Sequence, residues 1–111
     1  MVKVTFLYFE DCPSHEAALE RLRQTIAEEG VAAEVEVIKV ETDEEALRYR
    51  FLGSPTILVE GRDIDPPPTG AQYALTCRAY RREDGRITPL PPAELIRQAL
   101  RKAVETHSDH L

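Results

Sequence analysis

Apolar and polar residues alternate along the chain in patterns that predict strands and helices in turn. Residues 2–9, "VKVTFLYF", are rich in β-branched and aromatic side chains and nearly continuously apolar, which is typical of a central strand buried on both faces. Apolar residues then recur at intervals of three and four from Pro13 to about Glu29, so a helix is expected there, ending at Gly30. Residues 32–40, "AAEVEVIKV", alternate valine with glutamate and predict a second strand with one wetter face.

A capping box marks the start of a second, short helix. Thr42 stands three residues before Glu45 and precedes Ala46, Leu47, Arg50 and Phe51. A third strand is expected over residues 56–60, after a glycine that ends the helix. A turn at Gly61-Arg62 is expected to follow that strand and to open a hairpin.

The second half of the chain predicts one more strand and a final helix. Three prolines in residues 65–70, "DPPPTG", favour an extended spacer. Residues 74–82, "ALTCRAYRR", are expected to form a short fourth strand that carries Cys77, with Asp84-Gly85 as the turn after it. Pro91-Pro92 marks the start of the last helix. The apolar face of that helix is expected to consist of Leu95, Ile96, Ala99, Leu100, Ala103 and Val104.

This order of elements predicts an α/β fold, β-α-β-α-β-(β)-α, with a central mixed sheet. Two strands joined through a helix form a parallel pair, and right-handed crossovers leave few topologies for so small a sheet. A chain of 111 residues is long enough for one compact domain and too short for two. We expect a single domain over residues 1–106 and a flexible C-terminal tail over residues 107–111.

Composition and charge exclude several classes of protein. The formal net charge is −6, and no run of basic residues interleaves with aromatic ones, which argues against a nucleic-acid partner. No stretch approaches the roughly 20 apolar residues of a membrane span, and no leader pattern is visible. We therefore expect a cytoplasmic protein that does not cross a membrane.

The two cysteines, Cys12 and Cys77, are the candidates for chemistry. They are too few for a disulfide scaffold, and a sparse cysteine in a reducing compartment is catalytic, metal-binding or buried, alternatives that the spacing leaves open. Cys12 comes just before the first predicted helix, with Pro13 at the first helical position, where free N–H groups favour a thiolate. Ser14 and His15 are close enough to stabilise that thiolate. The acidic pair before Cys12 opposes it, so the sequence leaves the sign of the net pKa shift open.

Two segments of the chain resemble the thioredoxin-like superfamily. "FLYFEDCPSHEAALERL" is similar to the family's strand, active cysteine and helix start, and "FLGSPTILVEG" resembles the family's segment with a cis proline that faces the cysteine. The resemblance implies a thioredoxin-like sandwich in which Cys12 is the nucleophile and Pro55, after a cis peptide bond, shapes the approach of the substrate. The binding residues that it implies around this centre are Pro13, Ser14, His15, Ser54 and Thr56. The family's dithiol members carry a second cysteine where this chain has His15.

The resemblance implies a thiol-disulfide oxidoreductase-like protein without a cofactor or metal ligands, whose partners are protein or small-molecule thiols and disulfides. The chain is also similar to small bacterial thioredoxin-like proteins that keep "CPS" at the helix start, "FLGSPT" and a later Cys-Arg pair. On that resemblance Cys77, or an external thiol, resolves the mixed disulfide at Cys12. The alternative is a non-catalytic binding protein of the same fold, for a soft thiophilic metal such as Cu(I) or for a protein partner. A purely structural role and the oligomeric state stay open.

Overall fold

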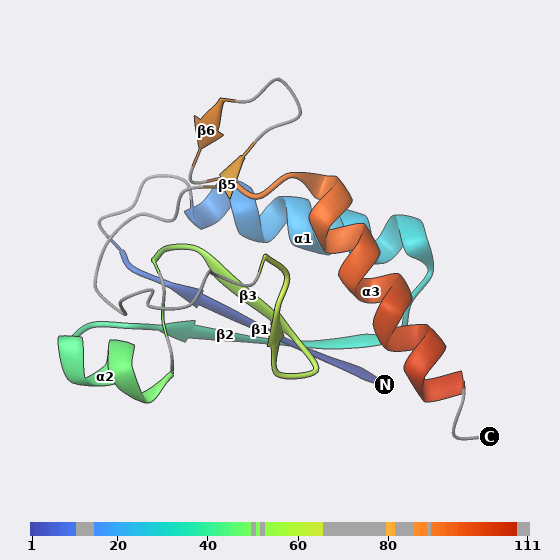
Figure 1. Ribbon diagram of the computed structural model, residues 1–111, viewed down its shortest axis with the longest axis horizontal. Coiled ribbons are helices and arrows are strands. Elements are labelled where there is room, and N and C mark those ends of the chain that lie inside the picture. The colour runs from blue at the N-terminus through green and yellow to red at the C-terminus, as the bar shows by residue number, and fades with distance from the viewer. Residues whose placement is uncertain are drawn as a thin grey trace.

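The predicted helices and the first three predicted strands follow one another in the predicted order. The computed structural model describes residues 1–10, 15–49, 51, 53–65, 80–81, 86–88 and 90–108. Its helices are α1 (His15–Glu29), α2 (Asp43–Arg48) and α3 (Ala93–Ser108) (Figure 1). Its strands are β1 (Val2–Tyr8), β2 (Ala33–Lys39), β3 (Thr56–Val59), β4 (Arg62–Asp63), β5 (Tyr80–Arg81) and β6 (Ile87–Thr88).

A mixed four-stranded sheet forms the centre of the molecule, with the strand order β2-β1-β3-β4. The strands β1 and β2 are parallel, with Val4 opposite Val35, as expected of strands joined through a helix. The strand β3 runs antiparallel to β1, with Leu7 opposite Thr56. The predicted α/β class and the mixed character of the sheet are therefore confirmed, in an arrangement compatible with a thioredoxin-like sandwich.

Alternate residues of β1 enter two separate hydrophobic clusters, because successive side chains of a strand point to opposite faces. Val4 and Phe6 belong to the larger cluster, which α1 and α3 cover through Leu22 and Leu100. Leu7 points to the other face and joins a smaller cluster of Val40, Ala46 and Phe51, which includes one residue of α2. Figure 1 shows α2 beside the end of β2, away from the pair formed by α1 and α3. The second face of the sheet is thus covered by a helix at one end.

Local signals in the sequence correctly predict where α1 ends and where α2 begins. Gly30 has φ of +64°, and the N–H of Val31 donates to the carbonyl of Ile26, so α1 ends at the predicted glycine. Thr42 caps α2 by accepting a hydrogen bond of 3.1 Å from the N–H of Glu45, as the capping box predicts.

The predicted hairpin is present, but its turn lies one residue earlier than expected. Val59 of β3 pairs with Arg62 of β4, so the two central turn residues are Glu60 and Gly61 rather than Gly61 and Arg62. Both have positive φ, 53° and 79°, which a two-residue turn matched to the twist of the strands requires.

The predicted fourth strand does not extend the central sheet in the described residues. Of residues 74–82, the structure describes Tyr80 and Arg81, which form β5 and pair antiparallel with β6 in a separate two-stranded sheet. The turn expected at Asp84-Gly85 lies outside the described residues, as does most of the spacer 65–70.

The final helix begins after Pro92, as predicted, but its buried face is shorter than the sequence pattern. Ile96, Leu100 and Ala103 are buried, whereas Val104 of the predicted apolar face is 39% exposed, so the buried part of that face ends at Ala103. The helix continues to Ser108, into the segment expected to form a tail. None of the helices in the described part of the chain is long and apolar enough to span a membrane.

Candidate functional site

A loop with a cis peptide bond leads into β3. The Ser54–Pro55 bond is cis, as the resemblance implies, and Gly53 before it has φ of 135°. The hydroxyl of Thr56 donates a hydrogen bond of 2.6 Å back to the carbonyl oxygen of Gly53, which ties the two ends of the loop together. Ser54, Pro55 and Thr56 are all buried. The loop therefore lies in the protein interior, backbone and side chains alike, and its place in the fold is fixed by these internal contacts.

The register of the sheet brings this loop to the end of β1. Thr56 is paired with Leu7, so Pro55 comes directly before the point where the last residues of β1 leave the sheet. The next strand along, β2, ends at the same edge, because the N–H of Val40 donates a hydrogen bond of 2.8 Å to the carbonyl of Tyr8. Ligands of open α/β sheets bind outside the carboxyl ends of the strands, which makes this edge the candidate site.

A buried tyrosine connects β5 to the cis-proline loop. The hydroxyl of Tyr80 donates a hydrogen bond of 2.7 Å to the carbonyl oxygen of Pro55, and the Tyr80 side chain is fully buried in the larger cluster. The bond satisfies a backbone acceptor that would otherwise cost free energy in a buried position. Tyr80 is thereby held at the same loop as the end of β1.

His15 is held by an aromatic contact at the start of α1. Its ring stacks on that of Tyr8, with ring centroids 4.7 Å apart and an interplanar angle of 24°. Tyr8 in turn lies 6.2 Å from Phe6, ring centroid to ring centroid, on the face of the sheet that carries the larger cluster. The imidazole of His15 is thus positioned by the last residue of β1 and is half-buried.

An ion-pair group borders the aromatic residues on the side of β2. The ammonium of Lys39 lies 2.7 Å from the Glu10 carboxylate and 3.3 Å from that of Glu41. The hydrogen bond from Lys39 lowers the pKa of the Glu10 carboxyl, and the positive charge of Lys39 adds to this effect. The hydrogen bonds that Lys39 donates to Glu10 and Glu41 raise the pKa of Lys39 itself. Glu10 and Lys39 therefore stay ionised at neutral pH.

The structure places some of the predicted site residues and leaves others outside its description. His15, Ser54, Pro55 and Thr56 belong to the segments that meet at the end of β1, as described above. The candidates Cys12, Pro13, Ser14 and Cys77 lie outside the described residues.

Sequence reasoning missed Tyr8, Tyr80 and Lys39 as parts of the site. The hydroxyl of Tyr80 makes a polar contact with the cis-proline loop, and Tyr8 makes a ring contact with His15. A signal for Tyr8 was available: it ends a strand seven residues before the first helical residue, at the edge where ligands of such sheets bind. No pattern in the sequence pairs Tyr80 with a carbonyl group 25 residues away.

Within the ranges that the structure describes, no three His, Cys, Asp or Glu side chains are grouped so that they could hold a metal ion. Comparison with models of known protein families finds no match, and comparison with curated proteins finds none either.

Proposed function

We propose that this protein is a thiol-disulfide oxidoreductase-like member of the thioredoxin-like superfamily that acts in the cytoplasm. In this proposal Cys12 is the nucleophile, Cys77 or an external thiol such as glutathione resolves the mixed disulfide, and no cofactor takes part. The substrates are disulfides of proteins or small molecules. The mixed sheet with its α/β element order is compatible with this superfamily.

One observation carries the proposal: the segments next to both cysteines meet at the cis-proline loop. Leu7, five residues before Cys12, is paired with Thr56, and the hydroxyl of Tyr80, three residues after Cys77, is bonded to the carbonyl of Pro55. Both cysteines are thus near in sequence to residues that lie at this loop. This convergence supports a functional pair of cysteines.

The proposed reaction transfers two electrons to the substrate. The Cys12 thiolate attacks one sulfur of the substrate disulfide, forms a mixed disulfide and releases the other sulfur as a thiolate, which takes a proton from water. The Cys77 thiolate then attacks the Cys12 sulfur, so the substrate leaves with both sulfurs reduced and a Cys12–Cys77 disulfide remains. Two molecules of glutathione reduce this bond and are oxidised to glutathione disulfide.

His15 is the residue that differs from dithiol members of the superfamily. It stands three residues after Cys12, and its ring is held against Tyr8. An imidazole cannot form a disulfide, but it can donate a hydrogen bond to a thiolate or to a leaving thiolate. In this proposal His15 therefore supports the first cysteine and leaves resolution to a thiol from elsewhere.

Thiol counting across a range of redox potentials tests the proposal. The purified protein is equilibrated in glutathione buffers, quenched with an alkylating mass tag and mapped for label at Cys12 and Cys77. We expect a reversible Cys12–Cys77 bond, or Cys12 glutathionylation, with a midpoint near the cytosolic glutathione poise of about −220 to −320 mV. Two thiols that stay free at every potential would contradict the proposal and favour a binding protein of this fold.

Two cysteine variants separate the roles of the thiols. Cys12→Ser is expected to abolish the mixed disulfide with a disulfide substrate, whereas Cys77→Ser is expected to trap it, because the internal resolving thiol is then missing. If Cys77→Ser turns over as fast as the unchanged protein, resolution comes from an external thiol. An unchanged protein that reduces no disulfide rejects the oxidoreductase function.

A further inference from the structure

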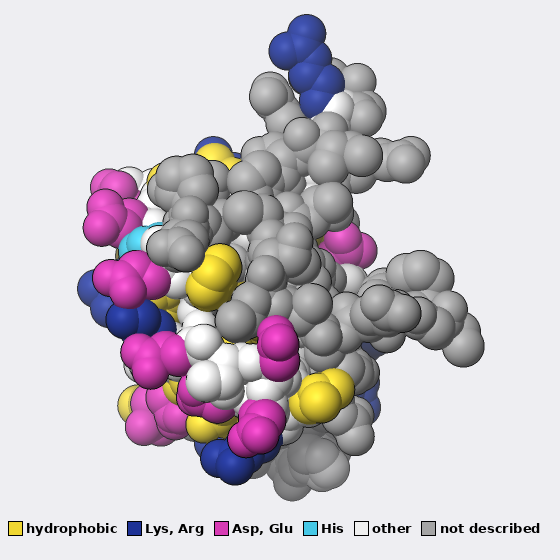
Figure 2. Space-filling view, turned by 90° about the vertical axis from the view of Figure 1, so that its left-hand side faces the viewer, with side chains coloured by type: hydrophobic (Ala, Val, Ile, Leu, Met, Phe, Trp, Pro, Cys, Tyr) yellow, Lys and Arg dark blue, Asp and Glu magenta, His cyan; other side chains and the backbone are white. Residues whose placement is uncertain are grey.

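The edge of the sheet at the carboxyl ends of β1 and β2 combines exposed apolar groups with carboxylates. We call it the carboxyl-end surface and define it by Phe9, Glu10, Glu16, Glu41, Glu44 and Leu47. Its parts are connected: Glu10 at the end of β1 shares Lys39 with Glu41, and Glu41 lies just before the Thr42 cap of α2. Figure 2 faces this side of the molecule and shows acidic side chains gathered on its described part.

Two apolar side chains of this surface, Leu47 and Phe9, are not fully buried in the core. Leu47 is 64% exposed and lies three residues after Glu44, so the two side chains share one face of α2. Phe9 packs against the smaller cluster on one side and is half-buried. Tyr8, the residue before it, packs on the larger cluster instead and stacks on the half-buried ring of His15. Exposed apolar groups rimmed by charged ones are typical of sites that bind another chain.

The helix dipole accounts for only part of this arrangement. Acidic residues in the first turn of α2, including Glu44, are favourable next to the positive end of a helix whatever their function. The same effect favours Glu41, which lies directly before the cap of α2, and Glu16 in the first turn of α1. It accounts neither for Glu10, which follows β1, nor for the exposure of Leu47. Lys39 compensates Glu10 and Glu41 in part, and the surface keeps an excess of negative charge.

We propose that the carboxyl-end surface is a docking site for a basic polypeptide segment that carries an apolar side chain among its lysines or arginines. The apolar side chain packs on Leu47, and the cations face Glu10, Glu16, Glu41 and Glu44. If the proposed function holds, on which this part rests, the bound segment brings its own disulfide to the cis-proline loop, and the surface selects basic proteins as substrates.

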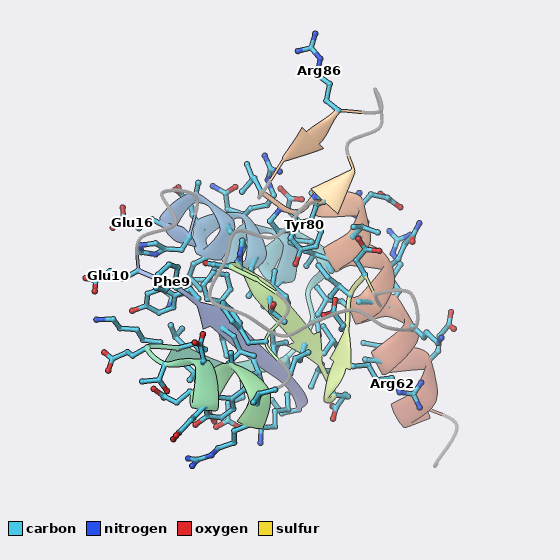
Figure 3. The ribbon with its side chains drawn as sticks, turned by 60° about the vertical axis from the view of Figure 1, so that its left-hand side comes forward. Phe9, Glu10, Glu16, Arg62, Tyr80 and Arg86 are labelled. Carbon is cyan, nitrogen blue, oxygen red and sulfur yellow. The ribbon has the colours of Figure 1, made fainter. Side chains whose placement is uncertain are left out.

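Charge complementarity favours a separate basic chain over a second copy of this protein. Figure 3 shows Phe9, Glu10 and Glu16 together on one side, with Arg62 and Arg86 away from them. Two copies each carry a formal charge of −6, so they repel one another at long range, whereas a basic chain is attracted from a distance. Opposite charges speed association and suppress wrong partners.

Fluorescence anisotropy with short labelled peptides tests the docking site. The probe contains lysine, serine and leucine; one control peptide has glutamate in place of lysine, and a second has serine in place of leucine. We expect saturable binding of the probe that weakens as salt is raised, since exposed charges are screened within about 10 Å at 0.1 M salt. Both control peptides are expected to bind more weakly. Equal binding of the glutamate peptide would overturn the proposal.

Matched variants locate the binding. Glu44→Lys is expected to weaken probe binding about fivefold, from lost attraction and new repulsion. Glu105→Lys makes the same change of charge at an exposed residue of α3 and is expected to leave binding unchanged. Leu47→Ser tests the apolar part of the surface in the same way. Val104→Ser is its control, because both side chains are exposed on helices. Circular dichroism tests whether each variant is folded. If Glu44→Lys does not fold, Glu44→Gln takes its place in the binding experiment.

The outcomes separate this proposal from the proposed function. Cys12→Ser is expected to keep full probe binding, so a protein that binds the probe but exchanges no disulfide retains the docking site alone. A protein that exchanges disulfides but binds the lysine and glutamate peptides equally would keep the proposed function and overturn the docking site. Equal losses in Glu44→Lys and Glu105→Lys would overturn the docking site. Self-association at low salt that Glu44→Lys abolishes would assign the surface to a second copy and overturn it too.

Discussion

The hydroxyl of Tyr80 donates a hydrogen bond of 2.7 Å to the carbonyl oxygen of Pro55, 25 residues earlier in the chain. This bond joins the small β5–β6 sheet to the loop that enters β3. Because both groups are buried, neither has water to replace its partner. The bond therefore fixes Tyr80 of β5 relative to the candidate site.

We expect Tyr80→Phe to lower the free energy of unfolding by about 1–3 kcal/mol, since it leaves the Pro55 carbonyl buried without this donor. Urea unfolding at neutral pH measures the change. Tyr49→Phe removes a hydroxyl from a half-buried ring and is the control, with a smaller expected effect. Equal unfolding midpoints for Tyr80→Phe and the unchanged protein would contradict the importance of the bond.

The stacked rings of Tyr8 and His15 are expected to stabilise the start of α1 together. A double-mutant cycle of Tyr8→Leu and His15→Ala should give a coupling free energy of about 0.5–1.5 kcal/mol, the usual size for aromatic pairs. Tyr8→Phe keeps the ring and should preserve most of this coupling. Additive effects in the Tyr8→Leu cycle would show that the two rings do not interact in solution.

The contribution of Glu29 to stability is expected to depend on pH. Arg101 donates a hydrogen bond of 2.6 Å to Glu29 and holds the pKa of its carboxyl below the ordinary 4.5. A carboxyl with a lowered pKa in the folded state stabilises the protein above its unfolded pKa, and this stabilisation is lost as the pH falls through the folded value. Glu29→Gln should therefore be less stable than the unchanged protein at pH 7, with the difference disappearing at pH values well below 4.5.

Urea unfolding of Glu29→Gln at neutral and acid pH measures this dependence. Glu20→Gln changes an exposed glutamate of the same helix and controls for the loss of one charge. A difference between Glu29→Gln and the unchanged protein that persists at low pH would mean that the ion pair is not its source.

Leu100 and Val104 lie on the same predicted face of α3 but have different surroundings. Leu100 is fully buried between α1 and the sheet, and Leu100→Ala is expected to cost about 2–5 kcal/mol in unfolding free energy. Val104 is exposed, so Val104→Ala should change stability by no more than about 0.5 kcal/mol. Similar costs for the two variants would place Val104 in the core after all.

Periodicity and capping predicted most of the fold because these signals are local. The alternation in residues 32–40, the capping threonine and Gly30 each report on neighbours within a few positions. Val104 shows the limit of such patterns: the apolar stripe of α3 continues, but the core beneath it ends at Ala103. A helical pattern predicts which face is apolar and not how far the opposing elements extend.

The hairpin turn shows how a local rule can be satisfied by an unexpected residue. Glycine marks turns with positive φ, and Gly61 does so here, but the other central residue is Glu60, a type seldom found in that conformation. The N–H of Lys3 bonds to the Glu60 carboxylate at 3.1 Å, and the N–H of Glu60 bonds to the carbonyl of Lys3. These contacts with β1 favour the earlier turn, and they come from the neighbouring strand rather than from the turn sequence.

The candidate site was less predictable than the fold because it is made of long-range contacts. The resemblance of "FLGSPT" to a cis-proline segment anticipated the Ser54–Pro55 bond, which the structure contains. The partners of Tyr8, Tyr80 and Lys39 depend on which strands lie side by side, and this information is not in any single stretch of sequence.

The strand β1 supplies Phe6 to one hydrophobic cluster and Leu7 to the other, so the two cores share a single register. Inserting or deleting one residue within β1 would turn every following side chain to the opposite face and disturb both cores at once. The two-residue connection between β3 and β4 touches neither cluster. Insertions and deletions of one residue should therefore be tolerated at the hairpin tip but prevent folding when they fall within β1. A library of random single-residue insertions and deletions tests this difference.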